Sequence, residues 1–357
     1  MTRRPSLLAV VLAALVATIL PAAAEEAPPP VKQIFLAHTQ PQNAASDPIA
    51  AMAVEFQHQV KERTQGRVTV GIFPAGQLGG NRDMVRLVSR NVVQSSFVTV
   101  GGIAPLCPSI AVIEMPFALP SEEVAYRVFD GPFGQKLAGV IEQKTGLAVL
   151  GFGDGGGFFA ITNSRRPIHA PSDMQGLKIR TVPGFEPLEA MISSLGAKPV
   201  AVSSREEATA LASGVVDGQM SPPVAVLANR FDDVQKYITL TDHLYTPTVW
   251  IFNRDALNGL SAEDQTAVRQ AATAALAVGR RVAHDVAEKQ LPVLRRRMEV
   301  IEPTPSELAA FKAATQPAVA AVVAKSLGEE GTQLLAAFLA AAKAPATPSN
   351  AASPSPR

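Results

Sequence analysis

Short apolar strands alternate with amphipathic helices along most of this 357-residue chain, and this alternation limits its fold more than any other feature. An apolar run at residues 34–37 precedes a helical pattern at 48–66, and a half-buried strand follows at 68–72. Beyond residue 150 the alternation restarts, with a strand at 177–182 and a helix at 185–195. Strands that alternate with helices in this way predict open α/β sheets covered by helices on both faces.

Two long helices are expected after these units. Residues 261–290 contain no helix breaker other than Gly279, which predicts a helix longer than a lobe of about 100–150 residues requires. Residues 305–342 form an alanine-rich helical stretch that we expect to be broken at Pro317 and at Gly328.

The two ends of the chain differ from its middle. Arg3 and Arg4 precede an apolar stretch at 7–20 and a small-residue site at 22–24, the layout of a secretory signal that is cleaved after residue 24. A retained anchor helix is the alternative reading. We expect a mature protein in the periplasm, without a lipid anchor because no cysteine lies near the cleavage site. Residues 344–357 contain four prolines and no large apolar side chain, which predicts a disordered tail.

Composition and motifs exclude several functions. Thirty-two Lys+Arg balance 31 Asp+Glu, so charge gives no reason to expect a nucleic-acid partner. Cys107 is the single cysteine and is expected to be a buried apolar residue, and the five histidines share no metal-ligand spacing. A G-x-G-x-x-G pattern at 151–156 is followed by a strand-like segment, although a dinucleotide site needs a helix there. We therefore expect no enzyme, no cofactor and no metal.

One strand carries charge where an apolar strand is expected. Lys178 and Arg180 lie on the same face of the segment at 177–182, which ends in a Pro-Gly turn. A buried arginine is costly unless it is paired, and its guanidinium matches a carboxylate in two hydrogen bonds. The residues alone leave two readings of Arg180: it pairs with an internal acid, or it binds an anionic ligand. A second segment, 214–223, places polar side chains at a strand end, where α/β folds bind ligands.

With these residues the chain resembles a known family, the DctP-like solute-binding proteins of tripartite ATP-independent periplasmic (TRAP) transporters. The resemblance covers roughly residues 31–300, and its specificity comes from the joint occurrence of several ordered motifs. These are Phe73-Pro74-Ala75-Gly76-Gln77-Leu78-Gly79, Met115-Pro116-Phe117, Thr162-Asn163-Ser164 with Arg166-Pro167-Ile168, residues 176–183, Leu195-Gly196-Ala197 with Pro199, residues 214–219 and Val234-Gln235-Lys236-Tyr237.

The resemblance implies a fold and a function. It implies a two-lobed α/β fold of the periplasmic-binding-protein kind (type II-like), with a ligand cleft between the lobes and a long helix that crosses both. The first lobe is then expected to comprise residues 31–157 and 247–286, and the second 158–246 and 287–343. Such a protein would capture a small organic acid and deliver it to a TRAP-type membrane permease.

The resemblance also implies a binding site. The family's carboxylate-binding arginine matches Arg180, which favours the ligand-binding reading of that residue. The other residues expected to line the cleft are Phe159, Ser221, Gln219, Ser204, Thr99 and His38.

Several positions depart from the family pattern. Phe159 stands where many relatives have a second arginine, Ser221 replaces an asparagine, and Ser204 an aromatic residue. The usual E-V-Y sequence reads Glu206-Glu207-Ala208. With one arginine replaced by an apolar ring, we expect a monocarboxylate with an apolar body rather than a dicarboxylate.

Two other functions were considered. A binding protein of the same fold could present its ligand to a sensory partner instead of a permease. An exported α/β enzyme would need a nucleophile or a metal cluster that the motifs do not supply.

Overall fold

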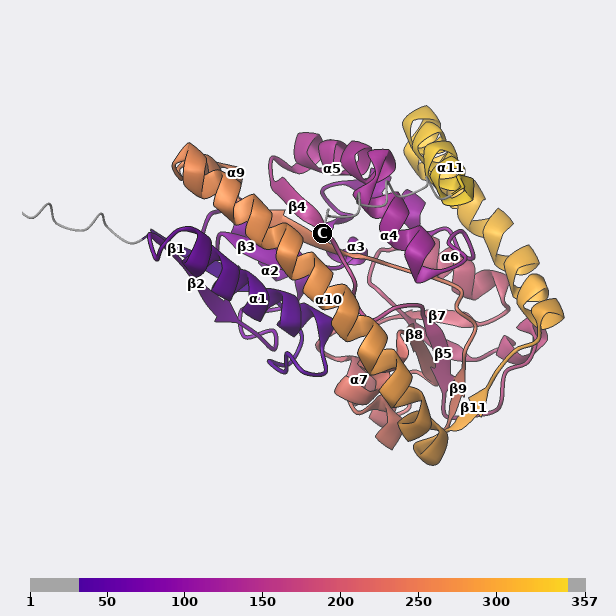
Figure 1. Ribbon diagram of the computed structural model, residues 1–357. Helices are drawn as coiled ribbons and strands as arrows, with labels where there is room; N and C mark the ends of the chain where they lie inside the picture. Colours follow the sequence, from indigo (N-terminus) through magenta and orange to yellow (C-terminus); the bar gives the residue numbers. More distant parts are fainter. Residues whose placement is uncertain (1–31, 346–357) are drawn as a thin grey trace, which may run out of the picture. The chain divides into compact units, whose positions relative to one another are not determined.

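Two β-sheets, each packed between helices, account for most of residues 32–345, which are the residues that the computed structural model describes (Figure 1). These residues belong to one compact unit of the chain. The predicted signal peptide at 1–24 lies outside the described residues, and so does all but the start of the predicted tail at 344–357.

The first sheet has the strand order β2-β1-β3-β10-β4. Strands β1, β2, β3 and β4 run in one direction, and β10 pairs antiparallel with both β3 and β4. Strand β10 comes from far along the chain and inserts between strands of the N-terminal half. The bounds are β1 Lys32–Ala37, β2 Val68–Phe73, β3 Ser95–Val98, β4 Ala148–Gly153 and β10 Thr248–Phe252.

The second sheet repeats this order. Its strands run β7-β6-β8-β5-β9-β11, and β5 is the antiparallel strand between β8 and β9. When the two strand orders are aligned, β6, β7, β8 and β9 of the second sheet take the places of β1, β2, β3 and β4 of the first. The bounds are β5 Ala160–Asn163, β6 Lys178–Thr181, β7 Lys198–Ala201, β8 Gly218–Ser221, β9 Tyr237–Thr239 and β11 Glu299–Ile301.

The shared order confirms the predicted two-lobed α/β fold. Each sheet contains one antiparallel strand that the chain adds as it crosses over: β5 follows the first crossing, and β10 follows the return. The two crossing segments run side by side, because Phe158 and Tyr245 form an isolated antiparallel bridge and Phe159 N donates to Leu244 O at 2.8 Å. The residue boundaries of the two lobes stay a prediction.

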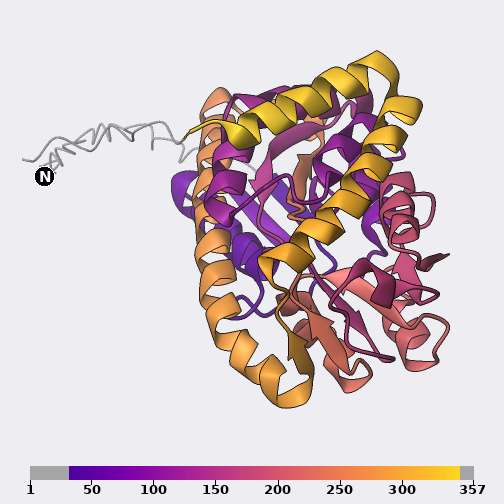
Figure 2. The same cartoon turned by 90° about the vertical axis from the view of Figure 1, so that its right-hand side faces the viewer.

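The helices cover the faces of both sheets (Figures 1 and 2). The longest helix of the first half, Pro48–Arg63, packs on β2 of the first sheet. The next longest, Pro132–Thr145, packs on β4 and on the η1 turn at Pro108–Glu114. The bounds in chain order are α1 Pro48–Arg63, α2 Asn81–Ser89, α3 Val100–Ile103, α4 Glu122–Asp130, α5 Pro132–Thr145, α6 Glu186–Ser194, α7 Glu207–Ala212, α8 Pro223–Ala228, α9 Arg254–Asn258, α10 Ala262–Arg297 and α11 Pro305–Lys343, with short 3₁₀ turns η2 Pro171–Met174 and η3 Phe231–Asp233.

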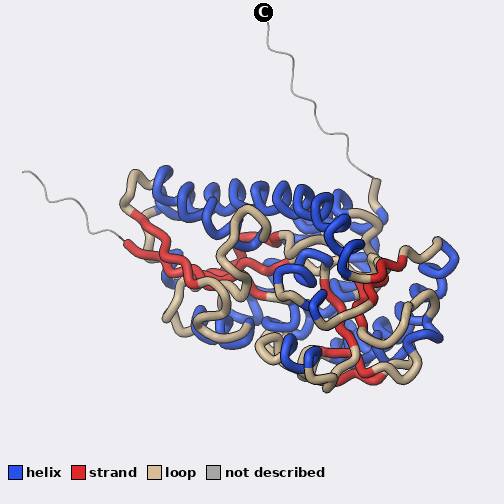
Figure 3. Tube along the Cα trace, turned by 90° about the horizontal axis from the view of Figure 1, so that it is seen from below, coloured by secondary structure: helices blue, strands red, loops and turns tan. Residues whose placement is uncertain are grey.

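Helix α10 is the predicted crossing helix, and it is longer than expected. It contacts α1 and β4 of the first lobe, then α8 and β11 of the second (Figures 1 and 3). Gly279 lets it pack closely, since a Cβ at this residue would lie 2.5 Å from Met52 Cγ. The helix continues past Gln290 and through Pro292 to Arg297.

Helix α11 corrects one prediction. Pro317 does not break it, and the only interruption in its described backbone is at Gly328, with φ of 59° and ψ of −145°. The two segments that meet at Gly328 lie over η1 and α6. Buried Phe311 and Phe338 anchor them to a large apolar core. Packing of these side chains holds a helix that the proline alone would disfavour.

The structure also tests the expectations for Cys107 and for the glycine pattern at 151–156. Cys107 is fully buried, as predicted. No helix begins at the third glycine of the 151–156 pattern: β4 ends at Gly153, and Asp154 Oδ1 accepts from the N–H groups of Gly156 and Gly157 at 2.6 and 2.8 Å. Among the described residues, no helix is long and apolar enough to cross a membrane.

Candidate functional site

The candidate site lies where the carboxyl edges of the two sheets meet. Parallel strands of α/β sheets end at the edge where such folds bind ligands. One hydrogen bond joins the two edges: Arg82 donates to Pro183 O. The edges also approach closely at two glycines, since a Cβ added at Gly80 would lie 3.8 Å from Ser204 Oγ, and one added at Gly101 would lie 3.3 Å from Val182 Cγ1. The predicted residue Ser204 is exposed and lies at this boundary.

Strand register places three predicted residues on one face of the second sheet. Ile179 pairs with Gly218, and side chains alternate along a strand, so Arg180 shares its face with Gln219 and Ser221. This face packs against the core formed by α7, α8 and the end of α10. Gln219 is fully buried, and its Nε2 donates to Thr162 Oγ1 at 2.9 Å.

Arg180 is mostly buried and only partly bound. Its Nε donates to Val202 O at 3.0 Å, and its Nη1 lies 3.4 Å from Glu207 Oε2. The two side chains are 12% and 10% exposed. No described residue forms a hydrogen bond with Nη2. The structure is therefore compatible with both readings of Arg180. Its guanidinium lies beside an internal acid, and it also has donors without a partner among the described residues.

His38 and Thr99 lie at the same edge of the first sheet. His38 follows β1, is fully buried, and makes one hydrogen bond, from Nε2 to Gln42 Oε1, at 3.1 Å. Burial lowers the pKa of His38 to about 4, with the Gln42 side chain and the backbone of Gln40 opposing the shift, so the imidazole is neutral at pH 7. Thr99 follows β3 and is exposed, and its N–H donates to Asn81 Oδ1 at 3.0 Å.

Phe159 lies on the first crossing segment, directly before β5. Ala160 pairs with Ser221, so Phe159 is next to the end of β8. Its ring is partly buried and meets the ring of His243 edge-on, with centroids 6.3 Å apart. The structure thus places Ser221, Gln219 and Arg180 on the adjoining strands β8 and β6, and Phe159 directly before β5 of the same sheet. It places His38 and Thr99 on the other.

Several buried polar atoms near these edges have no hydrogen-bond partner among the described residues. They include Nδ1 of His38, Oε1 of Gln219, Oγ of Ser221 and Oγ1 of Thr181 and Thr246. Buried polar groups are nearly always paired in native proteins, so a cluster of unpaired ones indicates a place for water or for a polar ligand. Three of these five atoms belong to residues predicted from the sequence.

Sequence reasoning missed Glu207 and Thr181. Glu207 was noted only as a departure from the family's E-V-Y, although a carboxylate in place of an apolar residue on a buried helix face signals a charged partner. Thr181 follows Arg180 on the opposite face of β6. The sequence around Thr181 contains no pattern that predicts a role in binding.

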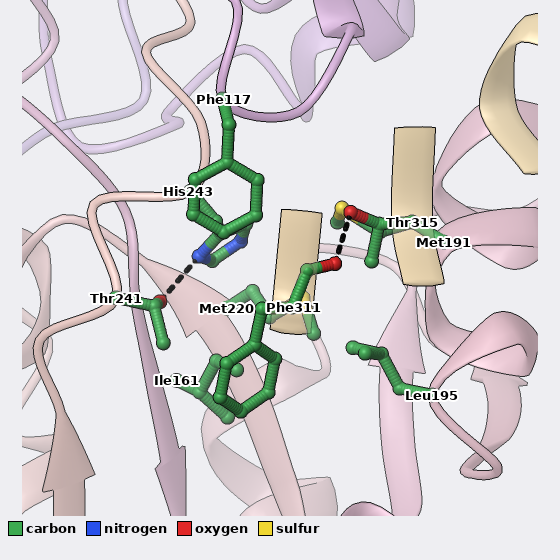
Figure 4. Close-up of a pocket in the computed structure, with 9 residues that line it drawn as sticks. All are labelled: Phe117, Ile161, Met191, Leu195, Met220, Thr241, His243, Phe311 and Thr315. Atoms are coloured by element: carbon green, nitrogen blue, oxygen red, sulfur yellow. Dashed lines mark hydrogen bonds between the residues drawn. The ribbon is translucent and has the colours of Figure 1, made fainter. Parts of the chain in front are cut away.

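A second enclosed space lies on the other face of the second sheet, against α6 and α11 (Figure 4). His243 Nδ1 lies 2.7 Å from Thr241 Oγ1 there, and most other lining side chains are apolar. The cavity measures about 10 Å³, close to the minimum for one water molecule and too small for an organic acid. We assign the candidate site to the sheet edges because α/β folds bind ligands at the carboxyl ends of their strands. No group of His, Cys, Asp and Glu in residues 32–345 is arranged to hold a metal ion.

Two α/β lobes that share one strand order and meet at their sheet edges are the architecture of two-lobed solute-binding proteins. The family model for bacterial extracellular solute-binding protein, family 7 (DctP), matches residues 38–326. The chain belongs to this family. Its members are periplasmic binding proteins of TRAP transport, and they are solute-binding proteins rather than enzymes.

Individual relatives bind different acids. The 2,3-diketo-L-gulonate-binding periplasmic protein YiaO of Escherichia coli is 32% identical over 217 residues, which cover 60% of this chain and 65% of that protein. The C4-dicarboxylate-binding periplasmic protein DctP of Rhodobacter capsulatus is 28% identical over 277 residues, 77% of this chain and 82% of that one. The sugar acid binding protein DctPAm of Advenella mimigardefordensis, solved with galactonate, has a TM-score of 0.81 at 28% identity and covers 88% of this chain and 99% of its own.

Proposed function

We propose that this chain binds a small organic acid between the two sheet edges, with one carboxylate held by Arg180, and delivers it to a TRAP-type permease. The observation that carries the proposal is the guanidinium of Arg180, which is 12% exposed and has donors without a partner in the described chain. A buried arginine offers a carboxylate two parallel, charge-assisted hydrogen bonds.

We further propose that the ligand is a monocarboxylate. Phe159 occupies the edge next to Ser221 and contributes no positive charge. The unpaired atoms of Ser221, Thr181 and His38 are suited to hydroxyl or carbonyl groups of the ligand body. This modifies the expectation of an apolar body: one side of the site is apolar and the other is polar. We also propose that the chain is exported and cleaved after residue 24, and that it does not convert its ligand into a product.

Calorimetric titration of D-galactonate and of succinate tests the proposal. We expect galactonate, as a monocarboxylate, to bind the wild type more tightly than succinate. Arg180→Ala removes the partner of a desolvated carboxylate and should lower the affinity by about 2–5 kcal/mol, or roughly 30-fold to several thousand-fold. Arg180→Lys should also weaken binding, because an ammonium group cannot form the bidentate pair.

The competing structural role makes a different prediction. If Arg180 serves only to neutralise Glu207, then Arg180→Ala lowers the Tm of the ligand-free protein and leaves the affinity for acids unchanged. The double variant Arg180→Ala, Glu207→Val removes both charges and keeps the empty protein close to wild-type stability. Wild-type affinity in this double variant would contradict the proposed role of Arg180.

A further inference from the structure

Glu207 is a buried acid next to the proposed ligand-binding arginine. It is the first residue of α7 and is 7% exposed. Its carboxylate has one charged neighbour, Arg180, and accepts no hydrogen bond from any described residue. A carboxylate removed from water in this way is costly unless it is well paired. Arg180 is therefore the described group whose charge favours the anionic form of Glu207.

The contact between them is an ion pair without a hydrogen bond. The distance of 3.4 Å between Nη1 and Oε2 exceeds the usual 2.7–3.2 Å, and a second contact that would complete a bidentate pair is missing. Because Nε is bound to Val202 O, the free edge of the guanidinium is the one formed by Nη1 and Nη2. Glu207 occupies one corner of this edge, and a ligand carboxylate would need both.

Other charged groups near this pair are engaged elsewhere or exposed. Lys178, on the same face of β6, donates from Nζ to Gly214 O at 2.6 Å. Glu206 accepts from Ser203 Oγ at 2.6 Å, and Arg82 of α2 donates to Pro183 O. Arg205 is exposed. Gln219 and Ser221 face the pair from β8 and carry no charge. The local balance is thus one cation and one anion.

We propose that Glu207 is the internal counterion of Arg180 in the empty site, and that a bound carboxylate displaces it and is accompanied by uptake of one proton at Glu207. This inference rests on the proposed function, since it requires an acid to bind at Arg180. Two carboxylates beside one guanidinium would leave a buried negative charge, and protonation of Glu207 removes it. Burial already raises the pKa of Glu207, with Arg180 acting in the opposite direction. A ligand that takes over Arg180 should raise this pKa further.

Two consequences can be measured. Binding should weaken as the pH rises, by up to about tenfold per pH unit while Glu207 takes up a full proton, because affinity is then linked to the proton concentration. Replacing Glu207 by an uncharged residue should remove this dependence and tighten binding at high pH by about tenfold, within the range typical of coupled sites. The affinity of the site for an acid would then depend partly on the proton that Glu207 takes up when the acid binds.

The experiment is calorimetric titration of D-galactonate and succinate at pH 6 and pH 8, each in two buffers of different ionisation enthalpy. The proteins are the wild type, Glu207→Gln, Glu207→Val and the control Glu206→Gln, which changes the neighbouring exposed acid. We expect proton uptake close to one in the wild type and the control, none in either Glu207 variant, and tighter binding by both variants at pH 8.

The outcomes separate this inference from the proposed function. Binding of either acid without proton uptake, or Glu207 variants that bind as weakly as the wild type at pH 8, overturns the role of Glu207 and leaves the proposed function standing. If neither acid binds any of the proteins, both proposals fail for these ligand classes. Proton uptake is measured on the wild-type chain, so it remains decisive even if a Glu207 variant does not fold.

Discussion

Phe159 is the residue whose identity bears most directly on the choice between one and two anionic groups. Its backbone precedes β5 beside the end of β8, and its ring meets His243 edge-on. Phe159→Arg should place a cation at this edge and raise the affinity for succinate by about tenfold, while leaving galactonate unchanged or weaker. Phe159→Leu is the matched control, since it removes the ring without adding charge. Succinate binding that is equally tight in the wild type and the Phe159→Arg variant would refute the argument.

Glu114 gives a second prediction at the same scale. It is buried at the end of η1, and burial raises its pKa to about 7, with the nearby Thr246 hydroxyl opposing the shift. The folded-state pKa is thus above the ordinary value, so the unfolded chain releases the proton first. Stability should therefore fall as the pH rises from about 4.5 to about 7, and the full loss, about 3 kcal/mol, should persist above that range.

Glu114→Gln removes this titration. Urea unfolding at pH 5 and pH 8 should show a variant that gains stability relative to the wild type only at the higher pH. Glu123→Gln, at an exposed position of α4, serves as the control and should behave like the wild type at both values. An equal difference between Glu114→Gln and the wild type at both pH values would contradict the assigned shift.

Individual site residues were predictable to different degrees. Arg180 was identifiable because a charged fork in an apolar strand demands an explanation. Gln219 and Ser221 are predictable as candidates because polar residues at a strand end are typical of a ligand-binding edge, and their role stays a prediction. Glu207 is not predictable in this way, because only the folded position of α7 brings its Oε2 within 3.4 Å of Arg180 Nη1.

At the scale of elements, the first crossing segment depends on one glycine. Gly156 has a φ of 118°, and a Cβ there would lie 1.9 Å from Val224 Cγ1 of α8. Gly156→Ala should lower the free energy of unfolding by at least about 1–3 kcal/mol, since both the backbone and the contact oppose it. Gly139→Ala is the matched control: this glycine lies within α5 with open space around it, and alanine should stabilise by about 1 kcal/mol.

Urea unfolding monitored by circular dichroism measures both variants. Equal stability of Gly156→Ala and the wild type would show that the crossing segment adapts to a side chain. It would also weaken the view of this segment as a rigid connection between the lobes.

Element prediction succeeded where the signal was local. The helix at α1 and the strand β2 follow directly from a capped apolar period and from strict alternation. The break predicted at Pro317 is wrong, because the packing of Phe311 and Phe338 against the core outweighs the local effect of the proline. The pairing of β10 joins it to β4, about 100 residues away, and to β3, about 150 residues away, and no local pattern specifies it.

At the scale of the whole molecule, the account depends on a ligand that is held between the two sheet edges. The hydrogen bond from Arg82 to Pro183 O joins these edges, and the paired crossing segments and α10 connect the lobes. A small acid enclosed in this way, and bound through a buried charge pair, should dissociate slowly enough to survive purification.

Native mass spectrometry of the mature protein, purified from the periplasm without denaturation, tests this claim most directly. We predict an adduct with the mass of one small monocarboxylic acid on the wild type, and its loss in the matched Arg180→Ala protein. An adduct that Arg180→Ala retains in full would contradict the account, and so would a wild type that carries none and gains none on addition of D-galactonate or succinate.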